Sequence, residues 1–311
     1  MAQQLVRALA SVVRNVPINR MKGRLAEKSL ALWGEENLDF EFYSRALRLQ
    51  WSARGYPDLL TRHMLFEGMY QQDVIVAFQS VVRPGDTVFD VGGHHGLMAI
   101  VAARLTGPDG IVISFEPNPQ ARRYFSENCA LNQVDNVRIE SVALSNEEGS
   151  TKFFVQKGPV SWNSSLFQDF ASQKGRDDVE TIDVQLTTLN RYVRDHGIVP
   201  KVIKIDAEGA ECLILKGAME TIEEHRPAVI MEFNPDSAAA AGTTIAELQA
   251  WFEKERYRLR VLTKSLLGYY SFDHWESFDE NKHATAELCN VVCLPEELKS
   301  ASAKNPKVQS V

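Results

Sequence analysis

The stretch Thr87-Val-Phe-Asp-Val-Gly-Gly-His-His-Gly96 decides how the chain folds, because a short apolar run passes directly into a glycine-rich turn. A strand of a parallel sheet has this apolar composition when helices cover both of its faces. Residues 95–105 follow with a helical pattern. The stretch therefore predicts a strand, a tight turn and a helix, which are the first parts of an α/β unit.

The same alternation of strand and helix continues through most of the chain. After the first unit the pattern predicts, in order, a strand at 110–116, a helix at 120–131, strands at 136–143 and 201–206, a helix at 212–225, a strand at 227–233 and a helix at 245–255. Runs at 257–263 and 288–294 are expected to close the sheet as an antiparallel pair. Such alternation predicts an α/β fold with a doubly wound, mainly parallel seven-stranded sheet of the Rossmann-like type.

Outside this core, three parts of the chain differ in character. Residues 1–69 have helical patterns without clear strand runs, including a helix expected at 40–51, so they form an N-terminal helical segment. Thr151–Val155 and Val179–Leu186 predict a small β insertion, and the segment 158–176 between them has the length of a lid. The main domain then spans residues 70–298, beginning with a helix at 70–82, and residues 299–311 are a flexible tail.

Composition excludes several classes of protein. The 311 residues contain 34 Lys+Arg and 41 Asp+Glu, a net charge of −7 without a basic block, which argues against nucleic acid as a partner. Four cysteines without paired spacing predict no disulfide framework and fit a reducing compartment. No stretch reaches the roughly 18 apolar residues of a membrane span. We expect a cytoplasmic protein. The sequence leaves its oligomeric state open, and a homo-oligomer is one of the options.

A carboxylate after the second strand indicates a nucleoside-bearing cofactor. Glu116 ends that strand and follows Gly96 by 20 residues, where a carboxylate accepts hydrogen bonds from both ribose hydroxyls. NAD and S-adenosylmethionine (SAM) both carry a ribose. Asp90 facing the cofactor would repel a pyrophosphate and attract an ammonium by about 4 kcal/mol at an effective dielectric of roughly 20. The run also lacks a strict G-x-G-x-x-G, so the residues favour SAM.

A second informative run, Lys204-Ile-Asp-Ala-Glu-Gly-Ala-Glu211, follows the fourth strand. Asp206 and Glu208 lie where this strand leaves the sheet, where the reactive end of a cofactor meets its substrate. Lys204 precedes Asp206 by two residues and points to the same face, which predicts a buried pair of Lys204 with a carboxylate. Glu211 begins the next helix, where an acid also suits the helix dipole, so its role stays open.

Together these motifs resemble the FkbM-type family of SAM-dependent methyltransferases. The resemblance covers about residues 70–295, with the run 204–211 as its most specific element. It is carried by Gly85-Asp86, Asp90–Gly96, Phe115–Pro119, Ala143-Leu144, Asn163–Leu166, Ile203–Glu211 and Gly217-Ala218. It implies a class I methyltransferase fold, with residues 70–298 as the SAM-dependent methyltransferase domain, and methylation of hydroxyl oxygens of natural products and saccharides.

The resemblance also implies roles for individual residues. The methionine part of the cofactor is assigned to Asp90, Gly92 and Gly96, with Gly93 in the same turn. The ribose is assigned to Glu116, with Pro117 and Asn118 beside it, and the adenine to Ser141, Val142 and Ala143. Asp206 is also a cofactor residue and lies with Glu208 near the transferred methyl. The chain departs from the family in the glycine-rich loop, usually Gly-Ala-Asn-Ile-Gly, whose middle residues are Gly93, His94 and His95. The family's upstream Tyr-Glu pair is Tyr70-Gln71 here, so Gln71 is a cofactor residue that keeps hydrogen bonding without a charge.

Methylation of a poorly acidic hydroxyl needs a base, and two carboxylates and one histidine are candidates. We assign Asp206 and Glu208 first and His94 next, whereas His95 is expected to pack at the helix start. A divalent cation on Asp206, Glu208 and Glu232 is an open alternative, although no metal is assigned.

Three other functions compete with a hydroxyl methyltransferase. These are an NAD-dependent oxidoreductase, a non-catalytic SAM-fold subunit, and a nucleic-acid N-methyltransferase, whose Asn/Asp-Pro-Pro-aromatic motif does not follow the fourth strand here. The acceptor expected is a small molecule or saccharide with a hydroxyl group.

Overall fold

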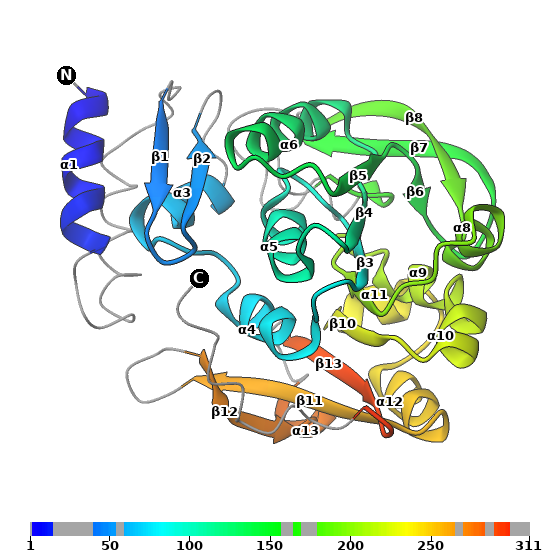
Figure 1. Cartoon of the computed structure of the whole chain (residues 1–311). Helices are drawn as coiled ribbons and strands as arrows, with labels where there is room; N and C mark the ends of the chain where they lie inside the picture. The colour runs from blue at the N-terminus through cyan, green and yellow to red at the C-terminus, as the bar shows by residue number, and fades with distance from the viewer. Residues whose placement is uncertain are drawn as a thin grey trace.

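The computed structural model describes residues 2–14, 40–53, 59–156, 164–168, 179–264, 270–283 and 289–298 (Figure 1). The structural statements below concern these residues. The predicted tail at 299–311 and most of the predicted lid at 158–176 lie outside the described residues.

An eight-stranded sheet forms the centre of the molecule, with the strand order β12-β11-β13-β10-β9-β3-β4-β5. Strands β5, β4, β3, β9 and β10 are parallel, and β13 runs antiparallel between β10 and β11. The strands are β3 (Thr87–Val91), β4 (Ile111–Phe115), β5 (Val137–Glu140), β9 (Val202–Ile205), β10 (Ala228–Phe233), β11 (Tyr257–Lys264), β12 (Tyr270–Ser277) and β13 (Cys289–Pro295). The predicted fold class, a doubly wound and mainly parallel α/β sheet, is confirmed.

The number of strands differs from the seven predicted. The additional strand is β12, which pairs antiparallel with β11 at one edge of the sheet. Its sequence mixes polar and aromatic residues and lacks the apolar run that is typical of the buried parallel strands. The closing pair expected at 257–263 and 288–294 is confirmed as β11 and β13.

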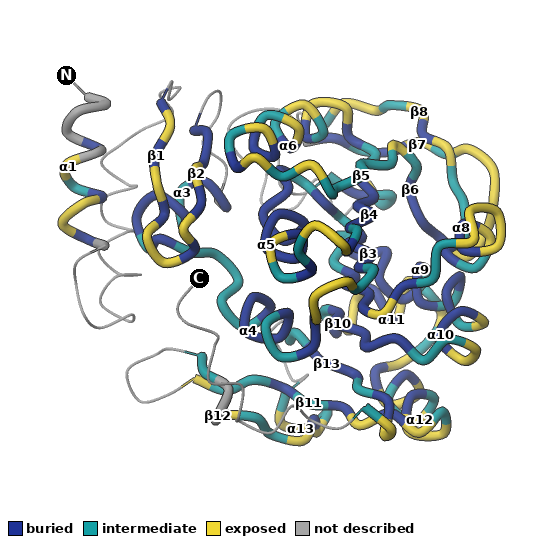
Figure 2. Tube along the Cα trace, viewed as in Figure 1, coloured by how far each residue is buried: buried dark blue, intermediate teal, exposed yellow. Residues whose placement is uncertain are grey.

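Helices cover both faces of the sheet, and two buried clusters lie between the layers. One face carries α4 (Gln72–Val81), α5 (Leu97–Thr106) and α6 (Pro119–Leu131). The other carries α8 (Leu189–His196), α9 (Glu211–Lys216), α10 (Met219–His225), α11 (Pro235–Ala240) and α12 (Ile245–Lys254). A short helix, α13 (Glu280–His283), follows β12. Figure 2 shows the central strands largely buried between these helices.

Side-chain alternation along β3 explains how charged groups come to lie in this core. Val88 packs in the cluster beneath α4 and α5, while Phe89 and Val91 pack in the opposite cluster. Asp90, two residues after Val88, therefore points to the α4 and α5 face. Lys204 on the neighbouring strand β9 shares this face, because Asp90 and Lys204 are register partners.

The N-terminal region contains a β-hairpin where a helix was expected. Residues 40–51 form β1 (Glu41–Ser44) and β2 (Leu49–Ser52) between the helices α1 (Ala2–Arg14) and α3 (Leu59–Phe66), so the helix predicted at 40–51 is wrong. Burial alternates with period two along β1, as in a half-buried strand. The hairpin docks on α6, where the Asn128 and Asn132 side chains accept hydrogen bonds from the Ser52 and Gln50 amides.

The predicted β insertion is confirmed as a separate three-stranded sheet with the order β6-β8-β7. Its strands are β6 (Ala143–Leu144), β7 (Gly149–Gln156) and β8 (Val179–Thr187). The strand expected at 136–143 is therefore divided, since β5 ends at Glu140 and Ala143 already belongs to the second sheet.

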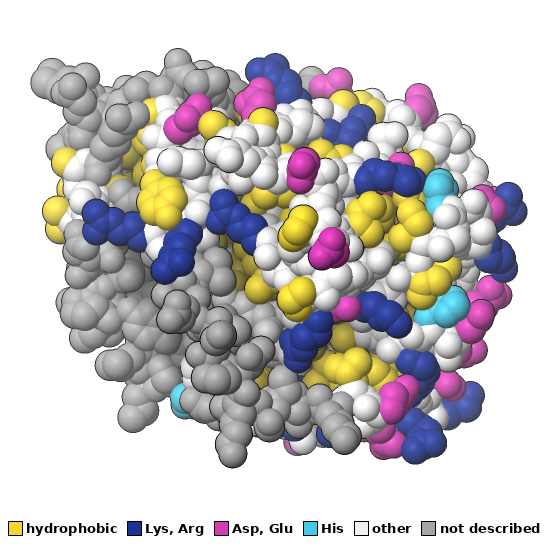
Figure 3. Space-filling model, in the orientation of Figure 1, with side chains coloured by type: hydrophobic (Ala, Val, Ile, Leu, Met, Phe, Trp, Pro, Cys, Tyr) yellow, Lys and Arg dark blue, Asp and Glu magenta, His cyan; other side chains and the backbone are white. Residues whose placement is uncertain are grey.

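Basic and acidic side chains are interspersed on the part of the surface near α8, α10 and α12 (Figure 3). None of the helices in the described segments combines the length and the apolar character that crossing a bilayer requires.

Candidate active site

A pocket opens at the carboxyl ends of β3, β4 and β9, the edge where open α/β sheets bind their ligands. It contains about 1060 Å³ of empty space, a volume that includes its open mouth. The N-terminal end of α4, the strand β6 and the segment around Ser164 complete its wall. The pocket therefore lies where a cofactor site of this fold is expected.

Most residues predicted for the site come together in this pocket. The predicted residues that line it are Gln71, Gly92, Gly93, His94, Glu116, Pro117, Asn118, Val142, Ala143, Asp206 and Glu208. Three predicted residues do not line it. Asp90 is fully buried behind the wall, Gly96 packs against the Phe125 ring, and Ser141 is exposed.

The glycine-rich turn brings two strand ends into close contact. Gly92 has a φ of +81°, and a Cβ atom there would lie 1.8 Å from the Asp206 carbonyl oxygen. Only glycine allows the turn after β3 to approach the turn after β9 so closely. The backbone amides of Gly92 and Gly93 both donate to the Phe115 carbonyl at 3.0 and 3.1 Å. The turn is thus fixed between its two neighbouring strands.

Glu116 is held in one orientation at the end of β4. Its Oε2 accepts from the His94 amide at 2.7 Å, and its Oε1 accepts from the Asn118 amide at 2.8 Å. Burial raises the pKa of Glu116, and these two hydrogen bonds oppose that rise. Each carboxylate oxygen keeps a further acceptor site, so the group is prepared to accept two hydroxyl hydrogen bonds.

Lys204 lies between two carboxylates at the base of the pocket. Its Nζ is 3.4 Å from Asp90 Oδ1 and 3.4 Å from Asp206 Oδ2, and it donates to the Gly92 carbonyl at 3.3 Å. The predicted buried pair is confirmed, with two acids instead of one. Although burial alone would lower the pKa of Lys204, the charges of Asp206 and Asp90 raise it. One buried ammonium therefore forms ion pairs with two carboxylates.

The two carboxylates differ in their other partners. Asp90 Oδ2 accepts from Ser114 Oγ at 2.9 Å, and burial raises its pKa. Asp206 Oδ2 accepts from Gln71 Nε2 at 3.0 Å. Burial would raise the pKa of Asp206 as well, but Lys204 and the hydrogen bond from Gln71 lower it. Asp206 is thus an ionised carboxylate on the pocket wall. Gln71 forms a hydrogen bond with this carboxylate, and its role toward a cofactor stays a prediction.

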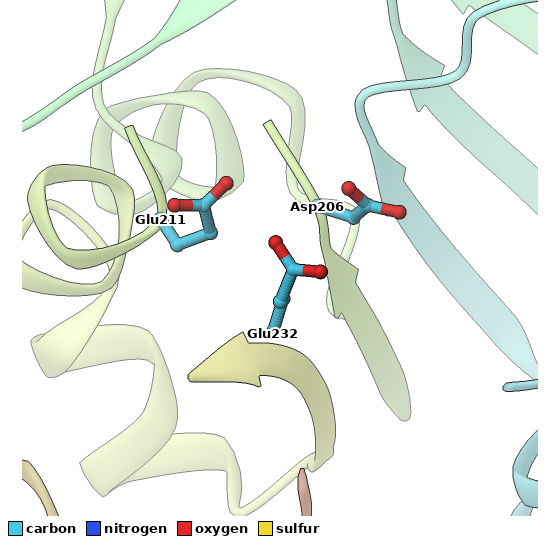
Figure 4. A group of neighbouring side chains, drawn as sticks. All are labelled: Asp206, Glu211 and Glu232. Atoms are coloured by element: carbon cyan, nitrogen blue, oxygen red, sulfur yellow. The ribbon is translucent and has the colours of Figure 1, made fainter. Parts of the chain in front are cut away.

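Two further acids, Glu211 and Glu232, lie beside Asp206 (Figure 4). Oxygen atoms of Asp206, Glu211 and Glu232 lie within 4.8 Å of one another. Burial, followed by the charges of Asp206 and Glu211, raises the pKa of Glu208 to about 8. The same causes raise the pKa of Glu232 to about 9. The sequence grouped Asp206 and Glu232 with Glu208, whereas the structure places Glu211 in this group.

The Glu211 carboxylate forms hydrogen bonds with the backbone of the turn that follows β9. It is fully buried, and its Oε1 accepts from the Ala207 and Gly209 amides at 2.9 and 3.0 Å, while its Oε2 accepts from the Gly209 amide at 3.1 Å. Its role, left open by the sequence, therefore includes binding the backbone of the turn that carries Asp206 and Glu208.

The two histidines of the glycine-rich loop stack on each other. Their ring centroids are 3.9 Å apart with an interplanar angle of 10°. His95 is buried at the start of α5, as expected, and its carbonyl accepts from Asn128 Nδ2 at 3.0 Å. His94 lines the pocket in a left-handed backbone conformation with a φ of 47°.

These features define the class of protein. The chain has the α/β fold of a class I methyltransferase, with a pocket that is rich in carboxylates at the carboxyl ends of its parallel strands. It belongs to the methyltransferase FkbM domain family, whose model matches residues 90–259.

Several methyltransferases are similar in sequence to parts of the chain. The 31-O-demethyl-FK506 methyltransferase FkbM of Streptomyces tacrolimicus is 27% identical over 192 residues, which cover 54% of this chain and 72% of that protein. The hexuronic acid methyltransferase AglP of Haloferax volcanii is 28% identical over 157 residues, 49% of this chain and 58% of that protein. Methyltransferase 1 of Beauveria bassiana is 25% identical over 151 residues, and the match spans 59% of its length.

Among solved structures, the methyltransferase FkbM from Methylobacillus flagellatus KT matches with a TM-score of 0.40 and 14% identity. The match covers 74% of this chain and 52% of that chain.

Proposed function

We propose that the protein is a SAM-dependent methyltransferase that transfers a methyl group to a hydroxyl oxygen of a saccharide or other natural-product small molecule. The observation that carries this proposal is the pair of fixed carboxylates in one pocket, Glu116 at the end of β4 and Asp206 after β9. We assign the activity to a methyltransferase domain at residues 70–298.

The residues of the pocket fit the chemistry of SAM. Glu116 has both oxygens oriented and retains acceptor sites for the two ribose hydroxyls. Asp90 and Asp206 share the single ammonium of Lys204, which leaves a net negative charge that favours a cationic ligand. A pyrophosphate would meet repulsion from the same charge. Val142, on the pocket wall after β5, is proposed to contact the adenine.

When bound, SAM supplies an electrophilic methyl group, and the residues of the chain must align the acceptor and remove one proton. Alignment alone contributes roughly 7–11 kcal/mol to such reactions. We assign the removal of the acceptor's hydroxyl proton to a carboxylate oxygen of Glu208. Its raised pKa of about 8 makes the ionised form a stronger base than Asp206, whose pKa is lowered. Asp206 instead stays ionised and binds the cofactor, with Gln71 and Lys204 fixing its orientation.

The class of acceptor is supported by two relatives. One is named for a 31-O-demethyl position of FK506, a natural product, and the other for hexuronic acid, a saccharide unit. The first name contains an O-demethyl compound and fits an oxygen acceptor, while the second fits a saccharide acceptor without stating which atom is methylated.

Calorimetric titration followed by a methyl-release assay tests the proposal. We expect heat of binding with SAM and with S-adenosylhomocysteine, and turnover with at least one hydroxyl compound of a glycan and macrolide library. Binding without turnover across the library would favour a non-catalytic subunit. Binding of NAD in place of SAM would favour an oxidoreductase and contradict the proposal.

A further inference from the structure

The turn that carries Asp206 and Glu208 has an uncommon backbone conformation. Glu208 has a φ of 46° and Gly209 a φ of 98°, so two successive residues are left-handed. A non-glycine residue rarely adopts this conformation and keeps it only where the surroundings hold it. The direction of the Glu208 side chain therefore depends on the groups that bind the backbone of this turn.

Three side chains from three parts of the fold bind this backbone. Glu211 accepts from the amides on one side of the turn. Two serine hydroxyls donate to its carbonyl groups, Ser165 Oγ to the Glu208 carbonyl at 2.7 Å and Ser237 Oγ to the Gly209 carbonyl at 2.8 Å. The peptide of Glu208 is thus held by a residue that is 43 positions away in the sequence.

Ser165 is itself fixed by the β insertion. It is buried, and its backbone exchanges two hydrogen bonds with Phe154 of β7, both of 2.9 Å. Its Oγ also accepts from the Phe167 amide at 3.0 Å. With its backbone and hydroxyl both bound, Ser165 has one orientation. Its neighbours Ser164 and Leu166 line the pocket, so the same short segment forms a wall of the site and supports the turn.

We propose that Ser165 is a positioning residue for Glu208: its hydroxyl fixes the Glu208 peptide and thereby directs the Glu208 carboxylate into the pocket. This rests on the proposed function, in which Glu208 removes the proton of the acceptor. It gives a role to the second serine of the Asn163–Leu166 motif, which the cofactor residues do not explain. It also connects the β insertion to the reactive end of the site.

The test compares Ser165→Ala with Thr106→Val. Thr106 is an equally buried hydroxyl that donates to the Ala103 carbonyl at 3.0 Å, near the opposite edge of the sheet from the pocket. Each hydroxyl makes two hydrogen bonds: Ser165 Oγ also accepts from the Phe167 amide, and Thr106 Oγ also accepts from Asn136 Nδ2. Both variants therefore lose two hydrogen bonds, so a general loss of stability affects them alike. Only Ser165→Ala is expected to lower kcat, by about 10-fold to 100-fold, because misplacement of a catalytic group by about 1 Å has such an effect. The Kd for SAM is expected to stay within about twofold of the wild type.

A double-mutant cycle with Glu208→Gln tests whether Ser165 acts through Glu208. If it does, Ser165→Ala lowers kcat much less in the Glu208→Gln background than in the wild type. The acidic limb of the kcat profile is also expected to move to lower pH in Ser165→Ala, because a less constrained Glu208 is less desolvated. Neither result is expected of a residue that only stabilises the fold.

Hydrogen exchange separates failure of this inference from failure of the proposed function. Amides 207–210 should exchange faster in Ser165→Ala than in Thr106→Val, whether or not any acceptor is methylated. Unchanged exchange in this turn would overturn the inference. An equal fall of kcat in both variants, or additive effects of Ser165→Ala and Glu208→Gln, would overturn it as well. Faster exchange without methylation of any acceptor would instead contradict the proposed function.

Discussion

Replacing Lys204 with methionine should destabilise the protein strongly. The Nζ atom lies 3.4 Å from each of Asp90 and Asp206, and Coulomb's law at an effective dielectric of about 20 gives about 5 kcal/mol per contact. Burying the ammonium offsets much of this attraction. Removing one partner from a buried ion pair typically costs about 3–5 kcal/mol, and we expect this loss for Lys204→Met.

The sign of the pH dependence follows from the same contacts. Asp206 has a lowered pKa in the wild type, so its contribution to stability is present above the ordinary value of 3.8 and is lost as the pH falls through its folded value. Without Lys204, both carboxylates have raised pKa values and the folded state binds more protons than the unfolded state. The stability of Lys204→Met therefore falls as the pH rises above about 4.

Urea unfolding at pH 5 and pH 8 measures both effects, with Lys152→Met as the control. Lys152 also pairs with a carboxylate, Asp183, at 2.7 Å, but both side chains are exposed. Its loss should leave the midpoint of unfolding nearly unchanged. The reasoning is refuted if Lys204→Met unfolds within about 1 kcal/mol of the wild type at pH 8, or if its stability rises with pH.

Two further changes test the site. Glu208→Gln should lower kcat by about 10²–10⁴-fold with a nearly unchanged Kd for SAM, and an equal loss of both would make Glu208 a cofactor residue. In the wild type, kcat/KM for the acceptor should rise with pH up to about 8, where the free enzyme loses the proton of Glu208, and a flat profile between pH 6 and 9 would exclude this base. Gly92→Ala should abolish SAM binding and lower the melting temperature, because the added Cβ would lie 1.8 Å from the Asp206 carbonyl oxygen. A variant that binds SAM normally would show that the two turns separate easily.

The central sheet and much of the pocket could be predicted because their signals are local. The apolar run before Gly92 and the spacing from Gly96 to Glu116 lie within short stretches of sequence. The spacing of Lys204 and Asp206 on one strand also predicted their shared face, which the structure confirms.

Features that depend on distant partners could not be predicted in this way. The hairpin at 41–52 is bound by the side chains of Asn128 and Asn132, which no local pattern indicates. The contact of Ser165 with Glu208 likewise depends on how the β insertion folds back onto the sheet. The convergence of Glu211 and Glu232 depends on the order of strands, and this order is a property of the whole sheet.

Calorimetric titration of S-adenosylhomocysteine into the wild type and Glu116→Gln tests the central claim most directly. Both oxygens of Glu116 accept hydrogen bonds from backbone amides. A glutamine at this position would place its NH₂ group against one of these N–H donors, and the site would lose a charged acceptor. A hydrogen bond to a charged group contributes about 1.5–3 kcal/mol, so we expect clear binding to the wild type and affinity about 100-fold weaker for Glu116→Gln. Equal affinity of the two proteins, or binding of NAD with no heat from S-adenosylhomocysteine, would contradict the account.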